Sequence, residues 1–221
     1  MKGKDSGKEF FEAAYKLGNK RVDAGLGWPI KGVGKHMDKF LSIIKKYVTS
    51  GRVLDIGCGE GRISIFFTTN GFESYGIDYV KTAVERAKKF AVEADVSENT
   101  HFNVGNVLDL QYKENFFDIV VDYSVFDHIE KQYWALYLKN LLNVLKPKGF
   151  YILSVFSVNT DFIKNRKQKW YYSGDAYFHF FSEKEIRDIF GKDFDMLEII
   201  EKPESEHPPP FMFYHVLMKK K

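Results

Sequence analysis

Short apolar runs alternate with amphipathic segments along most of this 221-residue chain. The apolar runs predict buried strands over residues 52–56, 73–78, 102–104, 116–122 and 150–155. Apolar residues that recur every three or four positions predict helices over residues 9–17, 35–48, 63–70, 80–95 and 132–145. This alternation is typical of a parallel sheet with helices on both faces.

The last part of the chain breaks this alternation. A helix is predicted over residues 183–190, and strands follow over 194–201 and 211–219 with a proline-rich loop between them. Because no helix separates these two strands, they must run antiparallel if they pair. The pattern therefore predicts an α/β fold with a mainly parallel sheet and a C-terminal antiparallel hairpin.

Composition and length limit the number of domains and the class of protein. A chain of this length with 44% hydrophobic and 29% charged residues is typical of one soluble globular domain, here residues 1–221. A net charge of +3 is too small to argue for nucleic acid. We see neither a signal peptide nor an apolar run long enough to span a membrane. The single cysteine favours a reducing compartment, so we expect a cytoplasmic protein.

The candidate chemistry centres on the run Val53-Leu54-Asp55-Ile56-Gly57-Cys58-Gly59-Glu60-Gly61, in which a strand enters a glycine-rich turn. A helix follows, so the turn is a candidate ligand site at the carboxyl end of a strand. Arg62 stands where the dinucleotide fingerprint needs a small residue, and the P-loop's Gly-Lys-Ser/Thr is missing. What remains is a G-x-G-x-G turn after an acidic residue, or a plain tight loop.

This run resembles motif I of the class I methyltransferases that use S-adenosylmethionine. The resemblance implies a Rossmann-like, doubly wound seven-stranded sheet and a cofactor site formed by Asp55, Gly57, Cys58, Gly59 and Gly61. Cys58 fits there as a small filler and not as a nucleophile. The likeness covers roughly residues 40–155 and is specific for the cofactor, not for the acceptor.

Two further elements match the family in order. Asp78, with Tyr79 beside it, follows Gly57 by about 20 residues, a distance at which an acid commonly binds ribose hydroxyls. Asp78 could also cap the next helix. Asn106 and Val107 match the family's adenine-binding element, although Asn106 replaces the usual acid and could simply be a turn residue.

The segment after the fourth strand matches the part of the family that meets the methionine moiety and the acceptor. Asp122 and Tyr123 are the cofactor candidates there. Tyr123, His128 and His179 are weak candidates for catalysis, and each has a structural alternative. Methyl transfer is an in-line displacement that positioning and water exclusion can drive, so no side chain is obligatory. No metal site is expected.

Two aromatic regions lie outside these motifs. One is a cap segment, residues 1–34, with Tyr15, Trp28 and Pro29; the other is an acceptor-side insertion, residues 156–181. Either could form a lid or an apolar acceptor site, or could simply pack onto the sheet. The expected function is methylation of a small molecule. The alternatives are an RNA or protein methyltransferase, or a non-catalytic S-adenosylmethionine-binding module.

A nucleic-acid acceptor is disfavoured by two features of the sequence. Enzymes that methylate base amino groups usually carry a proline pair after the fourth strand, and none follows Asp122. Cytosine-C5 enzymes need a cysteine in that region, but Cys58 lies in the glycine turn. No membrane partner is expected, and the sequence does not indicate an oligomeric state.

Overall fold

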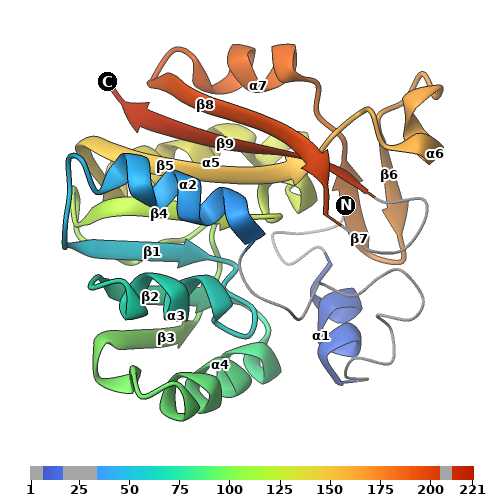
Figure 1. The fold of residues 1–221 in the computed structure, drawn as a ribbon. Helices are drawn as coiled ribbons and strands as arrows, with labels where there is room; N and C mark the ends of the chain where they lie inside the picture. Colours follow the sequence, from blue (N-terminus) through green and yellow to red (C-terminus); the bar gives the residue numbers. More distant parts are fainter. Residues whose placement is uncertain (1–6, 17–33, 205–210) are drawn as a thin grey trace.

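The structure is a computed structural model that describes residues 7–16, 34–204 and 211–221. The described residues form a seven-stranded sheet with the strand order β3-β2-β1-β4-β5-β9-β8 (Figure 1). Its strands are β1 (Arg52–Ile56), β2 (Glu73–Asp78), β3 (Thr100–Val104), β4 (Phe117–Tyr123), β5 (Leu145–Phe156), β8 (Phe194–Pro203) and β9 (Met212–Lys220). The main helices are α1 (Lys8–Lys16), α2 (Gly34–Ile44), α3 (Arg62–Thr69), α4 (Lys81–Glu93), α5 (Trp134–Val144) and α7 (Glu183–Phe190).

The predicted mixture of parallel and antiparallel strands is confirmed. Strands β3, β2, β1, β4 and β5 pair in parallel. Strand β9 lies between β5 and β8 and runs antiparallel to both. The first five strands therefore end at one edge of the sheet, where α/β proteins bind their ligands.

Helices cover both faces of the sheet, as a doubly wound fold requires. On one face, α2 and α3 bury residues such as Phe40 and Phe67 against Val53 and Ile119. On the other face, α5 and α7 bury side chains such as Tyr137. Consecutive residues of β4 alternate between the two clusters, since strand side chains point to opposite faces in turn. None of the helices in the described ranges has the length and apolarity that a membrane span needs.

The boundary between α5 and β5 differs from the prediction. The predicted helix over residues 132–145 ends at Val144, and β5 begins at Leu145 and not at Phe150. Leu145 already pairs with Phe117 of β4, and the register of the two strands then shifts before Ile119. Pro147 lies within this irregular stretch, where the ladder needs no hydrogen bond from it.

The insertion after β5 is more ordered than the sequence suggested. It contains the short helix α6 (Asp161–Lys164) and an antiparallel hairpin of β6 (Trp170–Ser173) and β7 (Ala176–His179). Ser173 pairs with Ala176, so Gly174 and Asp175 form a two-residue turn, and Gly174 has a φ of 62°. A glycine with positive φ is a known hairpin signal, so the two aromatic runs around it could have been recognised as strands.

Some predicted features lie outside the described residues. These are the N-terminal loop with Trp28 and Pro29 and the proline-rich loop before β9.

Candidate functional site

The glycine turn and two of the predicted acids meet at the carboxyl edge of the sheet. In the ladder between β1 and β4, Ile56 stands opposite Asp122. In the ladder between β1 and β2, Ile56 stands opposite Ile77, which directly precedes Asp78. The parallel sheet thus brings together residues that the sequence only placed in order.

The glycine turn has a backbone that other residues rarely adopt. Gly57, Gly59 and Gly61 have φ values of 64°, 52° and 80°, in the left-handed region. A Cβ atom on Gly57 would lie 2.2 Å from Val125 Cγ2. A Cβ atom on Gly59 would lie 2.5 Å from the hydroxyl of Tyr15. Gly57 therefore lets the Val125 side chain pack closely against the turn. The missing side chain of Gly59 leaves the space that the Tyr15 hydroxyl of α1 occupies.

Asp55 is turned toward α3 of its own chain. Its carboxylate accepts hydrogen bonds from the backbone amide of Ser64 (3.0 Å) and from the Ser64 hydroxyl (2.7 Å). The side chain is buried, and this burial raises the pKa of Asp55 to about 7 against the effect of the Ser64 bonds. Asp55 thus ties the start of α3 to β1 and fixes the turn between them.

Asp78 connects the glycine turn to the start of α4. One carboxylate oxygen accepts from the Gly59 amide at 2.9 Å, and the other accepts from the Val80 amide at 2.8 Å. Burial raises the pKa of Asp78 to about 6, although these backbone bonds lower it. The bond to Val80 closes a turn just before α4, whose N-cap is Val80 without a side-chain cap, so Asp78 does not cap this helix as the alternative expected. The role of Asp78 toward ribose hydroxyls stays a prediction.

Cys58 points away from this edge and into a small apolar cluster. Its amide donates to the carbonyl of Ile77 at 3.0 Å, and its side chain packs with Val84, Ala87 and Phe102. Burial raises the pKa of the Cys58 thiol. The thiol therefore acts as a packing group between the turn and α4.

Asn106 forms a turn with its own chain. Its side-chain oxygen accepts from the backbone amide of Leu108 at 2.8 Å. The neighbouring Val107 is partly buried against the core cluster that includes Leu108 and Ile77. The turn role proposed for Asn106 is thus present, and its role toward an adenine ring stays a prediction.

Asp122 organises the segment that follows β4. Its buried carboxylate accepts from the amides of Val125 (2.9 Å) and Phe126 (3.3 Å) and from the hydroxyl of Tyr137 on α5. Burial raises the pKa of Asp122 to about 6. Asp122 therefore holds the loop that packs against Gly57 through Val125.

Tyr123 lies on the opposite face of the sheet from Asp122, as neighbouring strand residues must. Its hydroxyl donates to Glu204 Oε2 at 2.6 Å, and its ring lies beside His36 and His215. Burial and the Glu204 carboxylate raise the pKa of Tyr123 far above its usual value. Tyr123 therefore belongs to a second polar cluster rather than to the glycine turn.

The two candidate histidines lie in the aromatic cover of the site. His128 Nδ1 is 2.8 Å from the carbonyl oxygen of Tyr177, and burial lowers the pKa of His128 to about 4. His179 lies beyond it, with Nδ1 3.0 Å from the Tyr177 hydroxyl and Nε2 3.2 Å from Glu185. Tyr177 thus contacts both rings, and His128 is the one nearer to α1, since it packs edge-on against Phe11.

Helix α1 bridges the glycine-turn side and the β6–β7 hairpin (Figure 1). At its start, the amides of Glu9 and Phe10 donate to the carboxylate of Asp175 in the hairpin turn. At its end, the carbonyl of Tyr15 accepts from Arg86 of α4 at 2.7 Å. The hydroxyl of Tyr15 lies over Gly59, and burial together with Asp78 raises its pKa well above the usual value.

The sequence did not identify some residues of α1 that contact this edge of the sheet. Glu12 accepts a hydrogen bond from Thr82 of α4 at 2.8 Å, and Phe11 packs between Tyr79 and His128. The amphipathic pattern of residues 9–17 signalled the helix but not its partners. Only the described fold shows that α1 covers this edge of the sheet.

Most aromatic residues of the insertion pack onto one another. Phe178 and Phe180 are buried with Phe156 and Phe213 in one cluster, and Phe10 of α1 packs against it. Trp170 and Tyr172 remain exposed. The hairpin is therefore an apolar wall that supports α1 beside the candidate site.

Comparison with known proteins gives a family and several relatives. A family model described as a methyltransferase domain matches residues 48–193. The chain is 24% identical to 2-heptyl-1-hydroxyquinolin-4(1H)-one methyltransferase of Mycobacteroides abscessus, over 67% of this chain and 64% of that protein. It is 29% identical to ubiquinone biosynthesis O-methyltransferase of Rickettsia bellii, over 55% of this chain and 45% of that protein. The matches thus span about half to two thirds of these relatives.

A solved structure shares the fold over nearly the whole chain. It is Burkholderia thailandensis 1,6-didemethyltoxoflavin-N1-methyltransferase with bound 1,6-didemethyltoxoflavin and S-adenosylhomocysteine. The TM-score is 0.76 at 19% identity, and the match covers 97% of this chain and 87% of that one. At 19% identity, this likeness shows only that the two chains share the seven-stranded fold.

Proposed function

Because this chain belongs to the methyltransferase-domain family, we propose that it transfers a methyl group from S-adenosylmethionine to a small-molecule acceptor. The observation that carries the proposal is the arrangement at the carboxyl edge of the sheet. There the carboxylate of Asp78 accepts from the Gly59 amide, and the Tyr15 hydroxyl of helix α1 lies over Gly59. In the proposed site, Asp78 is the group that would accept hydrogen bonds from the ribose hydroxyls.

The residues present fit this cofactor. S-adenosylmethionine has ribose hydroxyls and no phosphate, and Asp78 offers the lone pairs that such hydroxyls need. Arg62, the cationic side chain directly after the turn, is paired with Glu60 at 3.6 Å. The room over Gly59 is now filled by the Tyr15 hydroxyl, so we expect α1 or the Tyr15 side chain to move when the cofactor binds.

The cofactor supplies an already activated methyl group, so the protein's task is to position the acceptor and exclude water. Helix α1 and the β6–β7 hairpin suit this task, since Phe11, His128 and Phe178 form a continuous aromatic cover. Burial keeps the His128 imidazole neutral at physiological pH, and an imidazole with a pKa of about 4 is a weak base. We therefore assign His128 a positioning role.

The covered site favours a small acceptor over a polymer. Helix α1 is held to both neighbours by hydrogen bonds of Asp175 and Arg86, and a folded RNA or protein would have to displace it. The named relatives act on small molecules, which supports the same conclusion. The single cysteine suits a reducing compartment, so we place the enzyme in the cytoplasm.

Calorimetry with S-adenosylmethionine and S-adenosylhomocysteine tests the cofactor. We expect Asp78→Ala to weaken binding at least about tenfold, or about 1.4 kcal/mol. Asp188→Ala is the matched control, because Asp188 is an exposed residue of α7 that pairs with Lys184. A preference for NAD, or equal binding by Asp78→Ala, would refute the proposal.

A labelled-methyl screen over metabolite, RNA and protein pools tests the acceptor. Label in the metabolite pool is the expected result. Label in RNA or protein would replace the small-molecule assignment. Cofactor binding without transfer to any pool would favour the non-catalytic module.

A further inference from the structure

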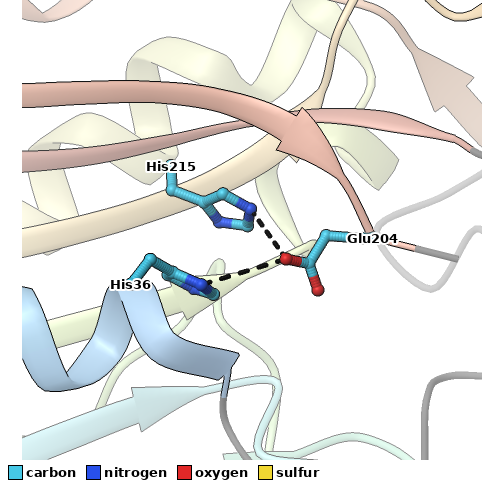
Figure 2. Close-up of side chains that lie close together, drawn as sticks. All are labelled: His36, Glu204 and His215. Atoms are coloured by element: carbon cyan, nitrogen blue, oxygen red, sulfur yellow. Dashed lines mark ion pairs between the residues drawn. The ribbon is translucent and has the colours of Figure 1, made fainter.

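Two histidines and a glutamate converge on the side of the sheet covered by α2 (Figure 2). His36 comes from the first turn of α2, His215 from β9, and Glu204 directly follows the last residue of β8. One potential ligand atom from each residue lies within 4.8 Å of the others. Glu204 Oε1 is 3.0 Å from His215 Nε2 and 3.9 Å from His36 Nδ1.

The two histidines of this cluster are buried, and among the described residues His36 has no hydrogen-bond partner for either ring nitrogen. His36 and His215 are 4% and 0% exposed. The other two candidate ligand atoms face each other, with His215 Nε2 3.0 Å from Glu204 Oε1. A buried polar group without a partner costs about 1–3 kcal/mol. The ring nitrogens of His36 carry this cost, and a ligand that binds one of them would remove part of it.

Hydrogen bonds from neighbouring residues orient Glu204 and His215. Tyr123 donates to Glu204 Oε2 at 2.6 Å, which leaves Oε1 toward the histidines. Ser154, the cross-strand partner of His215, is 2.8 Å from Nδ1 of that ring. When Nδ1 carries the proton and donates to Ser154, the lone pair of Nε2 is available to a metal ion. Metal-binding histidines and carboxylates are typically oriented by such partners.

Lys202 shows that this point attracts a cation. Its ammonium lies 2.6 Å from Glu204 Oε1, and its side chain is partly exposed on β8. An ammonium has only donors, and among the described residues both ring nitrogens of His36 remain without a hydrogen bond. A metal ion would accept lone pairs from all three residues at once, while the flexible lysine side chain can turn toward solvent.

We propose that His36, Glu204 and His215 form a binding site for a divalent transition-metal ion, best matched by Zn²⁺. Two neutral imidazoles and one carboxylate are a known zinc ligand set that leaves a fourth position open. Tetrahedral ligands at zinc bond lengths stand about 3.4 Å apart. The separations of 3.0 and 3.9 Å from Glu204 Oε1 lie on either side of this value. The rings of His36 and His215 are stacked with centroids 3.8 Å apart, so one ring must rotate before both direct a lone pair at the same ion.

The site is separate from the proposed cofactor site. Tyr123 and Asp122 are neighbours in β4, but their side chains lie on opposite faces of the sheet. Zinc binding can therefore be tested whether or not the protein transfers methyl groups.

The test uses the full-length protein stripped with a chelator. Competition with a chromophoric zinc chelator gives the Kd for Zn²⁺, and elemental analysis after dialysis gives the stoichiometry. We expect one tightly held equivalent and a Kd at least about 100-fold weaker in His36→Ala and Glu204→Gln, since the loss of even an outer-shell partner costs 10–100-fold. His101→Gln should bind zinc like the wild type, because His101 pairs with Glu73 at the other edge of the sheet.

Lys202→Met distinguishes a metal site from a structural ion pair. Removing the competing ammonium should tighten zinc binding about tenfold or more, whereas a purely structural cluster would gain nothing. Circular dichroism checks that each variant is folded. Absence of stoichiometric zinc in the wild type, or wild-type affinity in folded His36→Ala and Glu204→Gln, overturns the proposal.

Discussion

Gly59 is the position at which the backbone of the glycine turn faces the covering helix α1. Its φ is 52°, and an added Cβ would come within 2.5 Å of the Tyr15 hydroxyl. Gly59→Ala therefore has two effects. The backbone must keep a left-handed conformation with a side chain, and the Tyr15 hydroxyl must move away from the turn.

The two effects have different magnitudes. A left-handed non-glycine residue costs about 1–2 kcal/mol, and each kcal/mol lowers the Tm of a domain of this size by about 2–4 °C. The contact with Tyr15 adds little to stability, because the far end of a side chain can turn away. The new methyl group, however, occupies the room proposed for the cofactor, so we expect S-adenosylmethionine affinity to fall at least about tenfold.

Gly71→Ala is the matched control. Gly71 has a φ of 91°, and a Cβ there would meet no atom within 4 Å. Thermal unfolding should give similar losses of Tm for both variants, whereas calorimetry should show weakened binding only for Gly59→Ala. Equal affinity of the two variants would mean that the glycine turn does not face the cofactor, and the reasoning would be wrong.

Three further predictions concern buried residues. Burial raises the pKa of Asp122 from 3.8 to about 6, so the folded protein holds the carboxyl proton more tightly than the unfolded chain does. The contribution of Asp122 to stability therefore falls as the pH rises from about 4 to 6. Asp122→Asn should remove a slope of at most about 1.4 kcal/mol per pH unit, measured as the wild-type minus variant difference in urea unfolding; identical slopes would contradict the raised pKa. Phe126→Ala should cost about 3–5 kcal/mol in the same assay, because Phe126 is fully buried and stacked on Phe181, and a loss below about 1 kcal/mol would speak against this packing. Cys58→Ala should keep cofactor affinity within about twofold, since the thiol packs against Val84 away from the site, and a tenfold loss would place it in the site instead.

Local sequence signals were sufficient for the order of elements and for the glycine turn. Gly57, Gly59 and Gly61 were recognisable because left-handed backbone strongly favours glycine, and all three have positive φ. The strands and helices were recognisable because their side-chain periods differ. The alternative prediction that Asp78 caps the next helix was wrong, because its carboxylate bonds the amide of Val80, the N-cap residue, before α4 begins.

Other features depended on which strands and helices come together. The hydroxyl of Tyr123 meets Glu204 only because β8 and β9 extend the sheet beyond β5. Asp122 receives a hydrogen bond from Tyr137 only because α5 packs on that face. Pairing across such distances follows from the global packing of the core and leaves no local pattern.

The sequence by itself thus determined the α/β fold, the strand that carries the glycine turn and the acids at the strand ends, because these follow from backbone conformation and side-chain period. The tertiary structure decided that α1 covers the turn and that His36, Glu204 and His215 meet between α2 and the sheet. The physical reason is that burial and the convergence of polar atoms are properties of three-dimensional packing between segments distant in the chain.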